Sequence, residues 1–252
     1  MKYDKRHKVI VVGNSPNLLN HSMGNIIDGH SIVIRCNYCH TRGFENSTGT
    51  KTDIWCTTMT HNKCKFRDKD FLNKNKKMSK RSSLLFSPDE LRQKMVWLRH
   101  DTNKGYVEQV VRDHHGKDVK WENMGRGKIN KGKWGHPAGP YHFCDNIRKN
   151  VIPYLDKHFK SSDHWVVTTG VAAMLYALTK YKKINIVGFS FYTENAHKIN
   201  KTYNGLTLSE NLRKEARNHT LLLEPLVSEG RINFILPAEK ELFYQIFNKQ
   251  KE

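Results

Sequence analysis

Apolar residues occur in short runs along this chain, and most of these runs end at small or polar residues. The first run covers residues 8–12, and a Gly-Asn-Ser-Pro turn follows it at residues 13–16. Similar runs lie at residues 31–35 and 53–56. Short apolar runs bounded by turn-forming residues are typical of buried β-strands. The first third of the chain therefore has the alternating pattern of an α/β protein.

The middle of the chain carries two helix signals. Ser87 suits an N-cap and Pro88 suits the first helical position, so we expect a helix from there to about Leu98. Residues 141–158 also have a helical pattern. Residues 61–81 are rich in Lys, Asn and Arg, a composition that predicts a solvated basic linker.

The second half of the chain predicts a helix between two strands. A strand is expected at residues 165–167, a helix at 171–180, and a strand at 184–187 that ends at Gly188. Small residues at 168–170 join the first strand to the helix. A strand, a tight turn, a helix and another strand in this order form the βαβ unit of a parallel sheet.

The end of the chain adds a last strand and a last helix. Thr207 and Glu210 have the spacing of a capping box, residues 232–236 predict a strand, and residues 239–249 predict a helix. A chain of 252 residues with 37% hydrophobic residues is sufficient for one core. We therefore predict a single α/β domain over residues 1–252, with a mainly parallel central sheet flanked by helices.

Residues 123–140 are predicted to form a mobile loop. This stretch contains five glycines and two prolines among basic residues. Long loops of this kind often act as lids over active sites. Trp134 and His136 are candidate contacts for an acceptor substrate, although a loop with no ligand fits the composition equally well.

Two strands of the predicted sheet end in small polar residues. Gly13, Asn14 and Ser15 follow the first strand, and Thr168-Thr169-Gly170 precedes the apolar helix. Ligands of open parallel sheets bind at the carboxyl ends of the strands. Backbone amides at turns and helix N-termini also point toward anions. The sequence therefore predicts that both turns face one crevice, which suits a phosphate or a carboxylate.

Residues 9–55 resemble the long sialylmotif of glycosyltransferase family 29, the eukaryotic-type sialyltransferases. The resemblance lies in the VVGNS turn, an Ile-Asp-Gly-His segment, Arg-x-Asn after a strand, and then Gly-Phe-Glu and Gly-x-Lys-Thr. Residues 165–190 resemble the short sialylmotif, with a Thr-Gly turn, an apolar helix and a terminal Gly-Phe. A bacterial sialyltransferase family, family 42, is similar more loosely, in its Gly-Asn turn and its Arg-Cys-Asn.

The resemblance implies a Rossmann-like glycosyltransferase of the A type that uses CMP-sialic acid and requires no metal ion. Transfer would invert the anomeric carbon and place sialic acid on a glycan hydroxyl, of a galactoside or a sialoside. In the family, asparagines of the long motif contact the nucleotide and the turn of the short motif holds the donor. The corresponding residues, with polar neighbours expected to help, are Asn14, Ser15, Asn37, Thr168, Thr169, Gly170, Ser190 and Tyr192.

Two histidines are candidates for the catalytic base. The last motif of the family is His-x4-Glu, which His219 and Glu224 match, and in the family this histidine is the base while Glu224 would be structural. The third motif, His-Tyr-aromatic-acid, is matched only in part at residues 191–194, so His197 is the alternative. A histidine suits this role because its pKa lies near neutrality.

The chain is strongly basic, with 43 Lys and Arg against 24 Asp and Glu and a net charge of +19. Such a charge attracts anionic partners. It either steers a CMP-sugar donor, or holds the enzyme at an anionic membrane with lipid-linked or anionic glycan acceptors, or binds nucleic acid. No recognised nucleic-acid motif accompanies the basic segments. A donor such as CMP-Kdo also fits, because it shares the carboxylate and the leaving group.

Cysteine use predicts a cytoplasmic protein, with peripheral membrane contact as an option. The chain has five cysteines, an odd number, and its N-terminal segment is charged rather than apolar. Secretory members of the family join the two motifs by a disulfide. The corresponding positions here are Val9 or Ile10, and Tyr181. The longest uncharged stretch, residues 165–179, is short for a membrane span.

We expect no cofactor and no metal. Asp68 and Asp70 have the Asp-x-Asp spacing of metal-dependent glycosyltransferases, but they lie in a basic run that predicts a solvated segment. A zinc site is the other alternative, but its candidate ligands lack the usual spacing. Those candidates are Cys36, Cys39, Cys56, His61 and Cys64.

Overall fold

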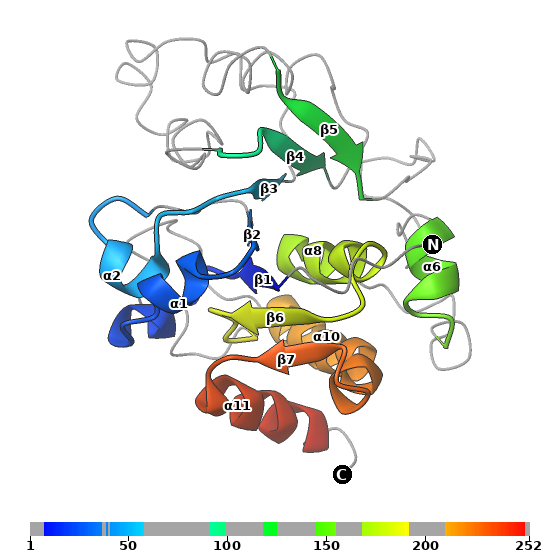
Figure 1. Cartoon of the computed structure of the whole chain (residues 1–252). Coiled ribbons are helices and arrows are strands. Elements are labelled where there is room, and N and C mark those ends of the chain that lie inside the picture. Colours follow the sequence, from blue (N-terminus) through cyan, green and yellow to red (C-terminus); the bar gives the residue numbers. More distant parts are fainter. Residues whose placement is uncertain are drawn as a thin grey trace, which may run out of the picture.

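The structure is a computed structural model. It describes residues 8–36, 39, 41–57, 91–98, 118–124, 145–154, 168–191 and 210–249. Within these residues the chain forms one sheet of seven parallel strands in the order β5-β4-β3-β2-β1-β6-β7 (Figure 1). The strands are β1 (Val9–Val12), β2 (Ile32–Cys36), β3 (Ile54–Thr57), β4 (Met95–Leu98), β5 (Lys120–Asn123), β6 (Ile184–Val187) and β7 (Ile232–Phe234).

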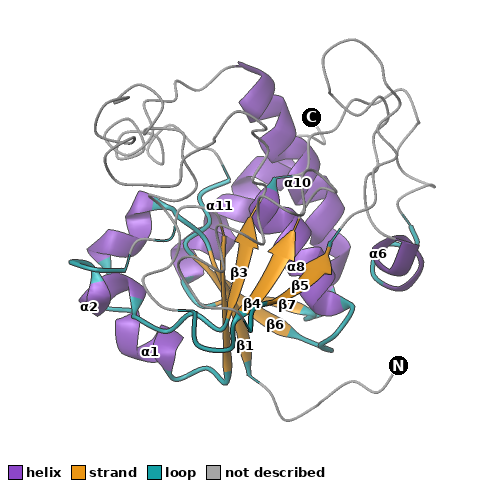
Figure 2. Ribbon diagram, turned by 90° about the horizontal axis from the view of Figure 1, so that it is seen from above, coloured by secondary structure: helices purple, strands orange, loops and turns teal. Residues whose placement is uncertain are grey.

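Helices cover both faces of the sheet (Figure 2). They are the 3₁₀ helix η1 (Pro16–Asn20) and the α-helices α1 (Gly24–Asp28), α2 (Glu45–Thr48), α6 (Asp145–Asn150), α8 (Thr169–Leu178), α10 (Glu210–Ser228) and α11 (Pro237–Asn248). Alternate residues of a strand point to opposite faces. In β1, Val9 and Val11 join the core that contains α8 and α10, whereas Ile10 and Val12 join the core of η1 and α1.

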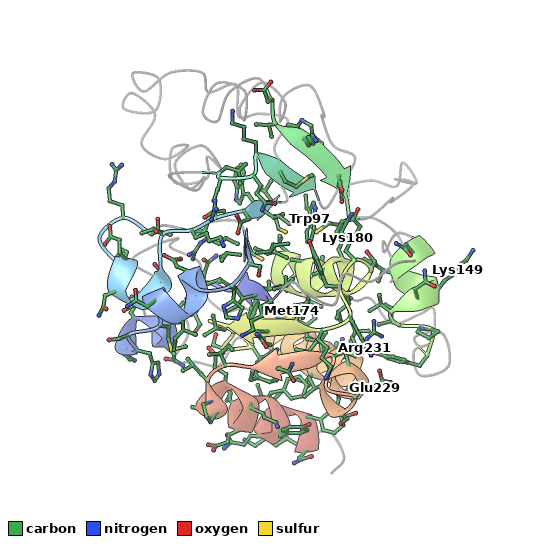
Figure 3. All side chains as sticks on the ribbon, viewed as in Figure 1. Trp97, Lys149, Met174, Lys180, Glu229 and Arg231 are labelled. Atoms are coloured by element: carbon green, nitrogen blue, oxygen red, sulfur yellow. The ribbon has the colours of Figure 1, made fainter. Side chains whose placement is uncertain are left out.

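Helix α8 lies centrally against the sheet. Its sequence is apolar nearly all the way round, which is typical of a buried helix. Met174 has no exposed surface and lies in the core that includes strand residues of β1, β2 and β3 (Figure 3). The N-terminus of α8 is thereby fixed in relation to the strands, and this positions the candidate site.

The strand order changes direction at β1. The chain builds outward from β1 through β2 to β5, and then returns to the other side of β1 with β6 and β7. The carboxyl ends of β1 and β6 therefore flank a topological switch point. In open α/β sheets this is the place where ligands bind.

The sequence predicted most of these elements. The strands at residues 8–12, 31–35, 53–56 and 184–187 are confirmed within one residue at either end, and α8 falls where the apolar helix was expected. The strand predicted at 232–236 ends earlier, at Phe234. The helix predicted over 141–158 is described only as α6, and residues 151–154 after it form a turn.

The helix predicted from Ser87 to about Leu98 is wrong for its described part. Met95–Leu98 form strand β4, which pairs in parallel with β3. Lys94 directly before it has a φ of 47°, a left-handed conformation that a continuous helix does not allow. Val96 and Trp97 are fully buried, and pairing with β3 determines their structure.

Strand β5 was missed, and the predicted start of the loop at residue 123 needs correction. Asn123 is the last residue of β5, and Met124 after it is buried. The other residues of the predicted loop, the basic linker at 61–81, the strand at 165–167 and Thr207 lie outside the described residues. The prediction of a single domain over the whole chain stays a prediction.

Candidate active site

The turn after β1 and the turn after β6 are held together at the switch point. The Gly13 amide donates a hydrogen bond to the Val187 carbonyl oxygen at 2.8 Å. The Ser15 amide donates to the Gly188 carbonyl oxygen, also at 2.8 Å. A Cβ atom on Gly13 would overlap that same Gly188 oxygen. Glycine is therefore required here because the two backbones touch.

The N-terminus of α8 lies beside these turns. Thr168 has an extended conformation and its hydroxyl oxygen accepts from the Val171 amide at 3.5 Å, a long N-cap contact. A Cβ atom on Gly170 would lie 2.7 Å from Cε1 of the Phe189 ring. The first amides of α8 have no acceptor within the helix, and the helix dipole makes this end attractive to anions.

Phe189 connects the two predicted turns. Its ring lies against Gly170, and its Cδ1 atom would be 3.1 Å from a Cβ on Gly13. The two turns named in the sequence therefore both lie against one half-buried ring, which brings them close together as predicted; a crevice between them stays a prediction. The sequence pointed to Gly188-Phe189 only as the end of the short motif and did not suggest this bridging position.

Asn14 and Ser15 differ in which of their polar atoms are available to bind a ligand. Asn14 is exposed, and its Nδ2 donates to the Cys36 carbonyl oxygen at 2.8 Å, which links the turn to the end of β2. This bond uses one amide hydrogen, so Oδ1 and the second hydrogen can bind a ligand. Ser15 is buried and its hydroxyl oxygen accepts from the Asn17 amide at 3.2 Å, so it caps η1.

Glu239 is a buried acid next to these turns that the sequence did not single out for the site. Its Oε1 accepts from the Gly188 amide at 2.8 Å and from the Phe189 amide at 3.1 Å. Burial raises its pKa from 4.5 to about 7, against the lowering effect of the two amides. From the sequence it is an ordinary acidic residue in the first turn of a helix.

His219 and Glu224 both lie on α10, but they do not face each other. Five helical positions correspond to a rotation of about 140° beyond a full turn. His219 is buried in the protein, whereas Glu224 is partly exposed and accepts a hydrogen bond from the Ser228 hydroxyl. Of the two motif residues, His219 is therefore the buried one; its role as the base and the structural role of Glu224 stay predictions.

The structure does not describe every predicted site residue. Ser190 is partly buried directly after Phe189, and Thr168, Thr169 and Gly170 begin α8 as expected. Five predicted residues lie outside the described residues: Asn37, Trp134, His136, Tyr192 and His197. Their roles stay predictions.

A second polar feature lies at the opposite, amino edge of the sheet. Asp28 accepts from the Thr50 and Lys51 amides, and the Lys51 ammonium donates to the carbonyl oxygens of His30 and Ser31. These residues belong to the Ile-Asp-Gly-His and Gly-x-Lys-Thr segments. A cavity of about 320 Å³ lies here, and its lining residues are Asp28, Thr50, Lys51, Thr52 and Arg92. Part of the long motif therefore stabilises the fold away from the switch point.

Two further observations concern metals and membranes. Of the zinc candidates, Cys36, Cys39 and Cys56 are buried and form no disulfide, while His61 and Cys64 lie outside the described residues. Across the described ranges, no three His, Cys, Asp or Glu side chains are grouped closely enough to hold a metal ion. No helix in the part of the chain that the structure describes is long and apolar enough to span a bilayer.

These features define an α/β protein with a Rossmann-like parallel sheet, in which the β1 turn, the β6 turn and the N-terminus of α8 meet at the switch point. Residues 1–229 match the model of glycosyltransferase family 29 (sialyltransferase). The chain therefore belongs to glycosyltransferase family 29, and the resemblance seen in the sequence is confirmed.

Individual relatives match over shorter stretches. The chain is 54% identical over 44 residues to the β-1,6-galactosyltransferase GALT29A of Arabidopsis thaliana, which covers 18% of this chain and 11% of that protein. It is 44% identical over 50 residues to a CMP-N-acetylneuraminate-β-1,4-galactoside α-2,3-sialyltransferase of Mus musculus, which covers 20% of this chain and 13% of that protein.

A solved structure confirms the fold. The crystal structure of a mammalian sialyltransferase superimposes with a TM-score of 0.50 and 17% identity, over 91% of this chain and 68% of that one. The Rossmann-like α/β class predicted from the sequence is therefore confirmed over most of the chain.

Proposed function

We propose that the protein transfers sialic acid from CMP-sialic acid to a hydroxyl of a glycan. The observation that carries this proposal is the meeting of the β1 turn, the β6 turn and the N-terminus of α8 around Phe189. The place suits a donor with a phosphate and a carboxylate, because the first amides of α8 have no acceptor within the helix and the exposed Asn14 amide group lies in the β1 turn. Membership of family 29 supports the same donor.

In this proposal the donor lies across the switch point. Asn14 and Asn37 bind the nucleotide, and Thr168, Thr169 and Gly170 bind the anionic part of the donor through hydroxyl and amide groups. Ser15, Ser190 and Tyr192 complete the donor-binding set. Ser15 contributes chiefly by capping η1, since its hydroxyl already accepts from the Asn17 amide.

We propose His219 as the catalytic base, with His197 as the alternative. The imidazole takes the proton of the acceptor hydroxyl while that oxygen bonds to the anomeric carbon of the sugar. The bond between this carbon and the phosphate oxygen breaks at the same time, and CMP departs with the electron pair. One displacement of this kind inverts the anomeric carbon. General base catalysis typically contributes about 10²- to 10⁴-fold.

Charge stabilisation of the departing CMP is proposed to require no metal. The N-terminal amides of α8 bind negative charge as it develops, and Tyr192 or His197 would add a hydrogen bond. The acceptor, which we propose is a galactoside, a sialoside or a lipid-linked anionic glycan, would contact Trp134 and His136. Activity in the cytoplasm or at an anionic membrane surface is part of the same proposal.

A donor screen tests this function. CMP release is measured from CMP-sialic acid and from CMP-Kdo, with galactosides as acceptors and with EDTA in a parallel series. We expect release from CMP-sialic acid that EDTA does not reduce. Asn14→Ala should weaken CMP binding, while Asn20→Ala, which changes an exposed asparagine at the end of η1, should not. Preference for random oligonucleotides over CMP would instead favour the nucleic-acid interpretation.

The galactosyltransferase relative supports a second candidate function. The 54% identity over 44 residues to GALT29A shows that a protein with another named activity shares part of this sequence. We propose galactosyl transfer as the alternative, with UDP-galactose as the further donor in the same screen. Release of UDP without release of CMP would replace the first proposal by this one.

A further inference from the structure

Glu239 is in contact with the candidate site although it lies outside the stretch that matches the family. The family model ends at residue 229, and Glu239 is the third residue of α11. Its side chain is 4% exposed. It turns inward to the turn after β6 instead of outward to solvent.

The two hydrogen bonds of Glu239 fix one short piece of backbone. Its Oε1 accepts from both Gly188 and Phe189, and without it the buried Gly188 amide would lose its acceptor. Gly188 has a φ of 79° and lies against Gly13, so this turn has little freedom to adopt another conformation. The carboxyl group therefore stabilises the conformation of this turn.

This turn is the piece that touches both donor-binding elements. The Gly188 carbonyl oxygen accepts from the Ser15 amide, and the ring of Phe189 lies against Gly170. A displacement of Gly188 and Phe189 would therefore change the distance between the β1 turn and the N-terminus of α8.

The carboxyl group of Glu239 has few hydrogen-bond partners for a buried group with a purely structural role. Its second oxygen, Oε2, is buried and has no hydrogen-bond partner among the described residues. Phe191, two positions after Phe189, has a φ of 46°, an uncommon conformation for an aromatic residue. Local features that are unfavourable for stability and persist together are typical of functional sites.

We propose that Glu239 is a positioning residue of the donor site, which sets the spacing between the Gly13–Ser15 turn and the N-terminus of α8 through Gly188 and Phe189. This inference rests on the proposed function, because it assumes that a CMP-sugar lies between these two elements. Glu239 does not touch the donor; it acts through the backbone that it holds.

The size of the effect follows from geometry. Misplacement of a binding group by about 1 Å can cost about a hundredfold in activity. Glu239→Gln keeps the acceptor oxygen and should retain the turn, whereas Glu239→Asp keeps the charge but shortens the side chain. We expect CMP affinity within about threefold of the wild type for Glu239→Gln, and a loss of about tenfold or more for Glu239→Asp and Glu239→Ala.

Calorimetric titration with CMP on the full chain tests this expectation. The dissociation constant reports the geometry of the site, and the stoichiometry reports the folded fraction. Glu241→Gln and Glu241→Ala are matched controls, since Glu241 is exposed on the same helix, and both should bind CMP as the wild type does. The proposal is overturned if Glu239→Asp and Glu239→Ala lower only the stoichiometry, or change nothing.

Hydrogen exchange separates this proposal from the proposed function. Peptides that cover residues 11–20 and 168–175 should exchange faster in Glu239→Asp than in the wild type, and those that cover β4 should not change. A wild type that fails to bind CMP refutes the donor class, and unchanged exchange in both peptides refutes the positioning role whatever the ligand is.

Discussion

Replacement of Glu239 by glutamine should change how the stability of the protein depends on pH. The pKa of this carboxyl rises from 4.5 to about 7 on folding, chiefly because burial disfavours the charged form. The folded state therefore binds the proton more tightly than the unfolded state. The contribution to stability is greatest below about pH 4.5, falls as the pH rises, and is lost above about pH 7.

The magnitude follows from the two pKa values. Their difference is about 2.5, and at about 1.4 kcal/mol per pH unit the wild type loses about 3 kcal/mol from this group between pH 4.5 and pH 8. Glutamine does not titrate. Any cost of its unpartnered amide group is the same at both pH values, so it cancels when the two are compared.

Urea denaturation at pH 5 and at pH 8 measures the effect. We expect the free energy of unfolding of Glu239→Gln, relative to the wild type, to be higher at pH 8 than at pH 5 by about 2 to 3 kcal/mol. Glu241→Gln should show no such change. If the difference between Glu239→Gln and the wild type is the same at both pH values within about 0.5 kcal/mol, the carboxyl does not titrate in this range and the reasoning about its burial fails.

Three further predictions concern the site and the core. Gly170→Ala would place a Cβ 2.7 Å from the Phe189 ring and should weaken CMP binding in calorimetry, whereas Gly29→Ala, whose Cβ meets nothing closer than 3.2 Å, should not. Met174→Ala removes a fully buried side chain and should lower the free energy of unfolding by about 2 to 5 kcal/mol in urea denaturation. His219→Ala should abolish CMP release in the transfer assay and leave CMP binding nearly intact; an active variant would move the base to another residue.

The elements that the sequence predicted are those with strong local signals. β1 is an uninterrupted apolar run, β2 and β6 are apolar except for Arg35 and Asn185, and α8 is apolar beyond the length of a strand. For these elements composition and length are sufficient. The meeting of the two turns followed as well, because the carboxyl ends of parallel strands lie at one edge of the sheet; that a ligand binds there stays a prediction.

The first error in the sheet, at β4, comes from pairing that no local signal contains. Met95–Leu98 is apolar but short, so its pattern is compatible with a helix or a strand, and the preceding Ser-Pro favoured a helix. In the structure Trp97 packs edge-on against Tyr176 of α8, with ring centroids 4.9 Å apart. Burial against α8 and pairing with β3 determine this segment.

β5 was missed for a different reason, because it is an edge strand with the sequence KWEN. The charge of Glu122 in this strand is paired through tertiary contacts. Glu122 accepts from the Tyr176 hydroxyl at 2.9 Å and pairs with the Lys180 ammonium at 2.7 Å. Both partners lie more than fifty positions later in the chain, so a local pattern cannot reveal them.

Arg35 is a residue of the long motif that has a structural role. It belongs to the Arg-x-Asn segment. The side chain is 2% exposed, and its guanidinium donates to the carbonyl oxygens of Thr48 and Lys51 at 2.6 and 3.0 Å. Burial lowers its pKa, against the raising effect of nearby acidic groups. Its donors hold the backbone before β3. In the reaction proposed above, stabilisation of the charge of departing CMP therefore depends on the amides at the N-terminus of α8 and not on Arg35. A change that weakens the positive potential at the N-terminus of α8 should therefore slow transfer more than a change at Arg35 that leaves the fold intact.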